Sequence, residues 1–178
     1  MWDNSRFHQG VNVSKNTVKA VFWITLYVVL SCAPLGLMLV GERPMGREFV
    51  RELSVALGFV GIAMTTLQFV LTARIAAVKA PFGSDVVYYF HHRISLVTFG
   101  LWLAHPIILF IKFPWARDLL NLITAPWRAR AGVTSVIAMI ILIVISVWRK
   151  RFKFEYVKWR IWHGILATLA LALVMIHA

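Results

Sequence analysis

Two apolar stretches of the chain each carry a spaced pair of histidines: residues 88–106, YYFHHRISLVTFGLWLAHP, and residues 159–178, WRIWHGILATLALALVMIHA. His91 precedes His105 by fourteen residues, and His163 precedes His177 by the same number. Fourteen residues are almost four turns of an α-helix, so the members of a pair share one face and lie about 21 Å apart along the axis. Because the hydrocarbon core of a bilayer is about 30 Å thick, each pair predicts one histidine near either face of a membrane.

The composition favours a chain that is dissolved in lipid. Hydrophobic residues make up 60% of the chain and the mean hydropathy is +0.76, whereas soluble domains average roughly 45–50% apolar residues. Five runs carry no charged residue, and each is close to the roughly 17–25 residues that a spanning helix requires. These runs are 20–41, 53–73, 94–111, 131–148 and 161–178.

We therefore predict an all-α membrane protein in which five transmembrane helices form one bundle. The helices are expected at about residues 20–41, 53–73, 91–111, 131–148 and 159–178. Residues 1–19 form a polar N-terminal arm, for which an interfacial helix and an irregular segment are both open. Residues 112–130 contain Pro114, Trp115, Pro126 and Trp127, which is typical of a re-entrant or interfacial loop at headgroup level.

The distribution of Lys and Arg predicts the orientation. The N-terminal segment and the second and fourth loops hold twelve of the nineteen basic residues. The cluster of Lys and Arg at 149–160 contributes most to this excess. Because basic loops stay on the cytoplasmic side, we expect a multi-pass protein of the cell inner or plasma membrane with a cytoplasmic N-terminus. The formal net charge of +12 is explained by anionic lipid headgroups, and no nucleic-acid partner is expected because the basic residues form no separate domain.

The four paired histidines are candidate metal ligands. The helices that carry them are the third and the fifth, which run parallel. His91 and His163 therefore share one depth in the membrane, and His105 and His177 share another. Each depth then offers two facing imidazoles, which is the axial ligand set of a six-coordinate haem. A closed zinc site is excluded because histidines four turns apart cannot converge on one ion.

Two other readings of these histidines stay open. A proton relay is disfavoured because the uncharged runs contain no Asp or Glu, although histidines inside membranes can carry protons. A haem-free membrane scaffold or assembly subunit, in which the histidines only bridge helices by hydrogen bonds, is the alternative function.

His91 is favoured over the adjacent His92 as the ligand. His91 and His105 are about 3.9 turns apart, whereas the 3.6 turns from His92 to His105 place these two on nearly opposite faces. His92 is expected at the cytoplasmic interface.

Three pieces of the chain resemble the ferric reductase-like transmembrane domain of ferric reductases and NADPH oxidases. They are GFVGIAMTTLQFVLTAR at 58–74 and the two histidine-containing stretches, which are the specific ones. The resemblance implies that His91 and His163 bind an inner, cytoplasmic-side haem b and that His105 and His177 bind an outer one. Family members typically continue into a sixth helix and into FAD- and NAD(P)H-binding domains, which are expected here on a missing C-terminal domain or a flavoprotein dehydrogenase partner.

The implied function is transmembrane electron transfer, as the haem-bearing part of an oxidoreductase. Electrons would pass from a cytoplasmic flavin to an acceptor on the opposite face, and ferric iron, dioxygen and quinone are equally open. No side chain is expected to act as a catalytic acid, base or nucleophile. Arg74, Arg93 and Arg160 are candidate contacts for the haem propionates, with ordinary cytoplasmic anchoring as the alternative.

Overall fold

The computed structural model describes residues 5–40, 48–73 and 75–178, and within these residues it is helical with no strand. Five of its helices are long and apolar enough to cross a membrane. This confirms the prediction of an all-α, multi-pass membrane protein with five spanning helices. The five are α1 (Ser5–Val40, with its candidate span from Asn16), α2 (Phe49–Thr72), α4 (Ser84–Lys112), α5 (Trp127–Val147) and α6 (Tyr156–His177).

The helices extend beyond the uncharged runs, mainly at their N-terminal ends. Helix α4 begins at Ser84, seven residues before the expected start, directly after Gly83 with its positive φ of 80°. Asp85 in its first turn favours this start because a carboxylate complements the positive end of the helix dipole. Helix α1 begins at Ser5, so the arm is helical from that residue and continuous with the first span; residues 1–4 lie outside the described part.

Two short helices connect the long ones. Helix α3 (Ala76–Lys79) lies between α2 and α4, and the 3₁₀ helix η1 (Pro114–Leu120) follows α4. Proline occupies the first turn of η1, where a missing N–H costs nothing. The segment expected as a re-entrant or interfacial loop is therefore partly ordered, and Trp115 and Trp127 are exposed on it.

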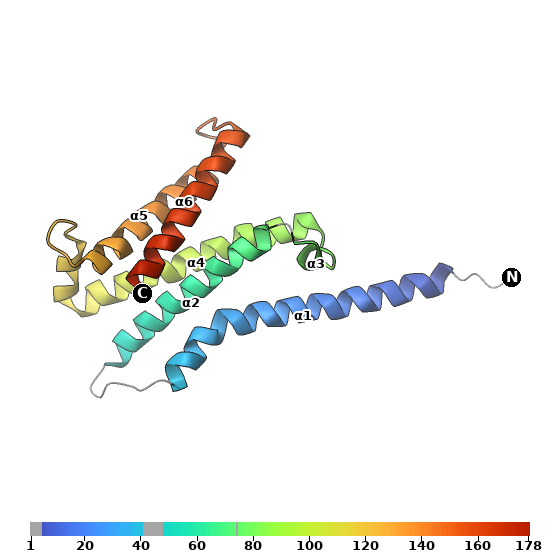
Figure 1. Ribbon diagram of the computed structural model, residues 1–178, viewed down its shortest axis with the longest axis horizontal. Helices are drawn as coiled ribbons and strands as arrows, with labels where there is room; N and C mark the ends of the chain where they lie inside the picture. The colour runs from blue at the N-terminus through green and yellow to red at the C-terminus, as the bar shows by residue number, and fades with distance from the viewer. Residues whose placement is uncertain (1–4, 41–47, 74) are drawn as a thin grey trace.

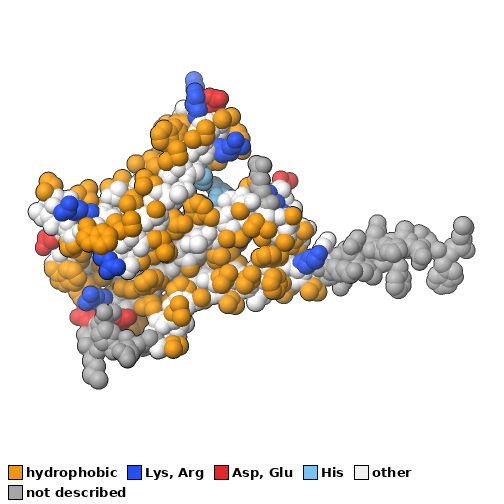
Figure 2. Space-filling view, viewed as in Figure 1, with side chains coloured by type: hydrophobic (Ala, Val, Ile, Leu, Met, Phe, Trp, Pro, Cys, Tyr) orange, Lys and Arg blue, Asp and Glu red, His pale blue; other side chains and the backbone are white. Residues whose placement is uncertain are grey.

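The bundle is built from two pairs of neighbouring helices. Helix α2 packs mainly on α4, α5 packs mainly on α6, and α1 lies along α2 on the outside (Figure 1). The α5–α6 pair diverges from the α2–α4 pair towards the α5–α6 turn. Figure 2 shows a hollow between the pairs with histidine side chains exposed inside it.

The buried core lies where the two pairs meet. Its members come from α4, α5 and α6, and they are Trp102, Ala138, Met139, Leu142, Ala170 and Val174. Trp102 and Val174 line one cavity, and Met139 and Leu142 line another. The core therefore separates two cavities that are stacked along the bundle.

Candidate functional site

The inner pair is His91 of α4 with His163 of α6. Both residues lie within the first eight positions of their helices, so they sit at the same end of the bundle. Their ring centres are 6.3 Å apart and their ring planes are inclined by 72°. Two residues separated by 72 positions in the sequence thus lie opposite each other across the gap between the helix pairs.

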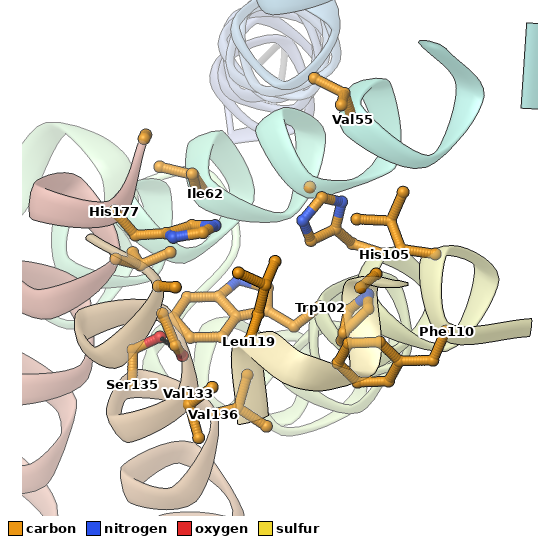
Figure 3. Close-up of a pocket in the computed structure, with 18 of the residues that line it drawn as sticks. Val55, Ile62, Trp102, His105, Phe110, Leu119, Val133, Ser135, Val136 and His177 are labelled. Atoms are coloured by element: carbon orange, nitrogen blue, oxygen red, sulfur yellow. Dashed lines mark hydrogen bonds between the residues drawn. The ribbon is translucent and has the colours of Figure 1, made fainter. Parts of the chain in front are cut away.

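The outer pair is His105 of α4 with His177 of α6, at the opposite end of the same two helices. Their ring centres are 6.2 Å apart and the ring planes are inclined by 64°. Figure 3 shows the rings of His105 and His177 at a shared cavity, with the indole of Trp102 beside them. The geometry of the outer pair repeats that of the inner pair.

The outer imidazoles are held by main-chain oxygens. The carbonyl of Ser54 lies 3.0 Å from Nδ1 of His105, and the carbonyl of Arg128 lies 3.0 Å from Nδ1 of His177. A carbonyl can only accept, so Nδ1 must carry the proton in both rings. Each ring therefore keeps an unprotonated Nε2, which is the form in which histidine binds a metal.

The inner imidazoles are held by side chains instead. Oε1 of Gln68 lies 2.7 Å from Nδ1 of His91, and the hydroxyl of Ser146 lies 3.0 Å from Nδ1 of His163. The indole N–H of Trp159 donates to the same hydroxyl at 3.4 Å. All four imidazoles thus have their Nδ1 engaged on a neighbouring helix, and among the described residues their Nε2 atoms have no hydrogen-bond partner.

Each pair of imidazoles lines a cavity of cofactor size. The cavity at the inner pair, the inner cavity, has a volume of about 710 Å³, and the outer cavity has about 520 Å³. Both volumes fall in the range of roughly 300–1,000 Å³ that is usual for ligand pockets. The outer cavity is bounded mainly by apolar side chains, among them Phe59, Ile62, Leu109 and Val136.

The donor set fits a metal held between two axial imidazoles. Metal–imidazole bonds are about 2.0 Å long and each ring centre lies about one ångström behind its nitrogen, so two opposed ligands have ring centres roughly 6 Å apart. The separations of 6.3 and 6.2 Å match this value. Among the described residues no three His, Cys, Asp or Glu side chains converge on one point, so the donors present suit a group that brings its own equatorial ligands, as a haem does.

Two basic residues reach the inner cavity, and only one of them was expected. Arg160, a candidate propionate contact, lines it, and so does Arg149, whose guanidinium lies over the rings of Tyr156 and Trp159. Arg93 instead lies over Tyr89 on its own helix and is not among the residues that line the inner cavity. Arg74 lies outside the described residues.

The two adjacent histidines of α4 differ in their surroundings. His91 is partly buried and bonded to Gln68, whereas His92 is exposed. Both line the inner cavity, but the 6.3 Å ring contact with His163 is made by His91. The expected preference for His91 therefore agrees with the positions of the two rings.

Two glycines make room for the outer imidazoles. A Cβ at Gly132 would lie 2.6 Å from Nδ1 of His177, and a Cβ at Gly58 would lie 3.3 Å from Cγ of His105. The sequence patterns assign neither glycine to the site. The hydrogen-bond partners Ser54, Gln68 and Ser146 were also missed, because no sequence spacing links them to the histidines.

One comparison with known proteins gives a match. Residues 57–174 match a protein family described as "Ferric reductase like transmembrane component". The matched region includes His91, His105 and His163 and ends three residues before His177. No curated protein and no solved structure matches the chain significantly.

Proposed function

Because the chain belongs to the ferric reductase-like transmembrane family, whose domains generally bind haem and transfer electrons across membranes, we propose that it holds two b-type haems, one between each facing pair of histidines. The observation that carries this proposal is the pairing itself. Two sets of imidazoles have ring centres 6.3 and 6.2 Å apart, at opposite ends of α4 and α6. In a haem-free scaffold the histidines would only bridge helices by hydrogen bonds, and nothing would require the Nε2 atoms of both pairs to be left without partners.

The chain's own residues bind and orient these groups. His91 and His163 would hold the inner haem, and His105 and His177 would hold the outer one. Gln68, Ser146 and the carbonyls of Ser54 and Arg128 fix the imidazoles through Nδ1, which orients the rings and raises their basicity.

The two sites differ in the charge around them. Arg149 and Arg160 line the inner cavity, where guanidinium groups suit the carboxylates of a haem. Among the described residues that line the outer cavity there is no Lys or Arg. A haem at the outer site would be held by the two imidazoles and by apolar packing, and we expect that site to lose haem more readily.

Bound haem supplies one-electron transfer, so two haems at these levels would connect a donor on one face of the membrane with an acceptor on the other. The inner site lies beside the basic α5–α6 turn, which the positive-inside rule places in the cytoplasm together with the N-terminus. This orientation fits a cell inner or plasma membrane. The donor we propose is a flavin on a dehydrogenase domain or subunit that uses NAD(P)H, and the acceptor is ferric iron, dioxygen or quinone.

A visible spectrum of the purified protein tests the proposal against the alternative of a haem-free scaffold. The detergent-solubilised chain, expressed with haem supplementation, is expected to show a Soret band and, after reduction by dithionite, the sharp α-band of six-coordinate b-type haem. A monodisperse, helical and colourless preparation would overturn the proposal and favour the scaffold.

A further inference from the structure

Gln68 occupies an unusual place beside the inner cavity. Its side chain projects from α2, is 7% exposed and lines the cavity, and its Oε1 lies 2.7 Å from Nδ1 of His91. Its amide nitrogen is also buried but has no hydrogen-bond partner among the described residues. The amide oxygen thus hydrogen-bonds the imidazole, and the amide nitrogen has no acceptor among the described residues.

The two ends of the amide have opposite consequences for His91. When the oxygen faces the ring, Nδ1 carries the proton and Nε2 keeps its lone pair. If the nitrogen faced the ring, it would donate to Nδ1, and the proton would move to Nε2, which could then not bind a metal. The carbonyls of Ser54 and Arg128 at the outer pair permit only the first arrangement, so Gln68 is a partner that can present either a donor or an acceptor.

We propose that Gln68 is the positioning residue of the inner site, which selects the metal-binding tautomer of His91 and sets the redox potential of the inner haem independently of the outer one. This inference rests on the proposed function, because it requires a haem between His91 and His163. A hydrogen-bond acceptor for Nδ1–H makes the imidazole a stronger electron donor to iron, which stabilises the ferric form.

The buried amide nitrogen supports the same orientation. A buried donor without an acceptor is unfavourable, and Gln68 lines the inner cavity, which offers space for an acceptor. A carboxylate of a bound group or an ordered water there would satisfy the nitrogen and keep the oxygen on His91. Occupation of the cavity and the binding-competent tautomer of His91 therefore stabilise each other.

Two substitutions of similar length separate this role from simple packing. Gln68→Glu keeps an acceptor and, as a carboxylate, strengthens it, so the midpoint potential of the inner haem should fall. Gln68→Met keeps the volume but removes the strong acceptor, so the potential should rise and haem affinity at the inner site should fall by about 10–100-fold. Thr66→Val, an exposed position of the same helix that lines neither cavity, is the matched control.

Redox titration of the complete haem-loaded chain, followed in the α-band, provides the measurement. His163→Ala identifies which of the two titration steps belongs to the inner haem. We expect opposite shifts of that step in the two Gln68 variants, with the outer step and Thr66→Val unchanged. If Gln68→Met folds poorly, haem titration of the apoprotein reports the loss of inner-site affinity relative to the outer site in the same sample.

The outcomes distinguish this inference from the function on which it rests. A wild-type chain with two low-spin haems, whose inner potential and inner-site affinity are unmoved by Gln68→Met, overturns the role of Gln68 alone. Equal shifts of both steps also overturn it, because they indicate a general loosening of the bundle. A wild-type chain that binds no haem overturns the proposed function as well.

Discussion

Each paired histidine is fixed by a partner on a neighbouring helix, and the partner differs from ring to ring. Nδ1 of His105 and Nδ1 of His177 each contact a main-chain carbonyl, which substitutions leave in place, and the hydroxyl of Ser54 also lies 3.1 Å from Nδ1 of His105. His91 depends on a side-chain amide instead. Such outer partners orient the ligand and are typically worth 10–100-fold in metal affinity. Side-chain substitutions at the histidine partners should therefore change haem affinity and redox potential mainly at the inner site.

The choice between the adjacent histidines gives a prediction at this scale. His91→Ala should abolish the low-spin signal of the inner haem, because it removes the ring that faces His163 at 6.3 Å. His92→Ala should leave both low-spin centres intact, since His92 is exposed and has no such contact. Electron paramagnetic resonance of the oxidised protein distinguishes the two; loss of a centre in His92→Ala alone would reverse the assignment.

Gly132 gives a second prediction. Gly132→Ala should displace His177, because the added Cβ would lie 2.6 Å from Nδ1 and 2.9 Å from Cε1 of that ring. We expect loss of the outer haem with retention of the inner one, measured as haem released per chain. Gly100→Ala is the matched control, since a Cβ there meets nothing within 4 Å; equal haem content in both variants would contradict the role of Gly132.

The candidate ligands could be predicted from the sequence, but their partners could not. The fourteen-residue spacing places two imidazoles on one helical face, and this regularity is visible in a single chain. Ser54 and Gln68 approach His105 and His91 across 51 and 23 residues, and only the packing of α2 on α4 fixes that approach. The cavity role of Arg149 depends on the same tertiary arrangement.

At the scale of elements, α2 and α4 are joined at one end by a reciprocal contact. Ser54, which is 0% exposed, donates its hydroxyl to the carbonyl of His105 at 2.9 Å, while its own carbonyl accepts from the ring. Gly58, one turn later on α2, lets the imidazole approach. Pro106 follows directly inside α4, where a bend is expected because proline cannot donate to the preceding turn. The contact therefore holds His105 directly before the proline of its helix.

Ser54→Ala should weaken the bundle without removing the outer haem. Its hydroxyl hydrogen bond is lost, which costs about 0.6–2 kcal/mol inside a membrane protein, but the main-chain carbonyl still accepts from His105. Thermal unfolding in detergent should show the loss of stability, with Thr66→Val as the exposed control. An unchanged transition, or complete loss of the outer haem, would contradict this account of the contact.

The long helices were predictable because each requires an apolar run of membrane length, and all five were found. Their bounds were less accurate, since polar residues at the ends carry no hydrophobic signal. The N-terminal extension of α1 to Ser5 and the 3₁₀ helix at Pro114–Leu120 both lie in such polar segments. A local hydrogen bond, from the guanidinium of Arg117 to the carbonyl of Phe110 at 3.0 Å, ties the second segment to the end of α4.

For the whole molecule, the two ends of the bundle are chemically unequal. The inner end carries the basic α5–α6 turn, with Lys158 72% exposed and Arg149 and Arg160 at the cavity. The outer end is covered by η1, and its cavity is apolar. This polarity suits an acidic flavoprotein surface at the inner end, because complementary charge accelerates association.

The isolated chain should accept electrons from dithionite but not from NADPH. Its sequence contains no Gly-rich dinucleotide loop that follows a strand, and nicotinamide oxidation needs a converter from two electrons to one, such as flavin. Stopped-flow spectra of the α-band measure both reactions. A flavoprotein dehydrogenase should enable reduction by NADPH, more slowly at high salt. Rapid reduction of these 178 residues by NADPH without any flavoprotein would contradict the proposal that their electrons come from a flavin.

The most direct test of the central claim counts haems against facing histidine pairs. Extracted haem per mole of purified, haem-supplemented protein should approach two in the wild type and one in both His163→Ala and His177→Ala. The double variant should bind none, while circular dichroism still shows a helical protein. A folded wild-type chain with clearly fewer than one haem, or single variants that retain two, would contradict the claim that each pair of imidazoles holds its own haem.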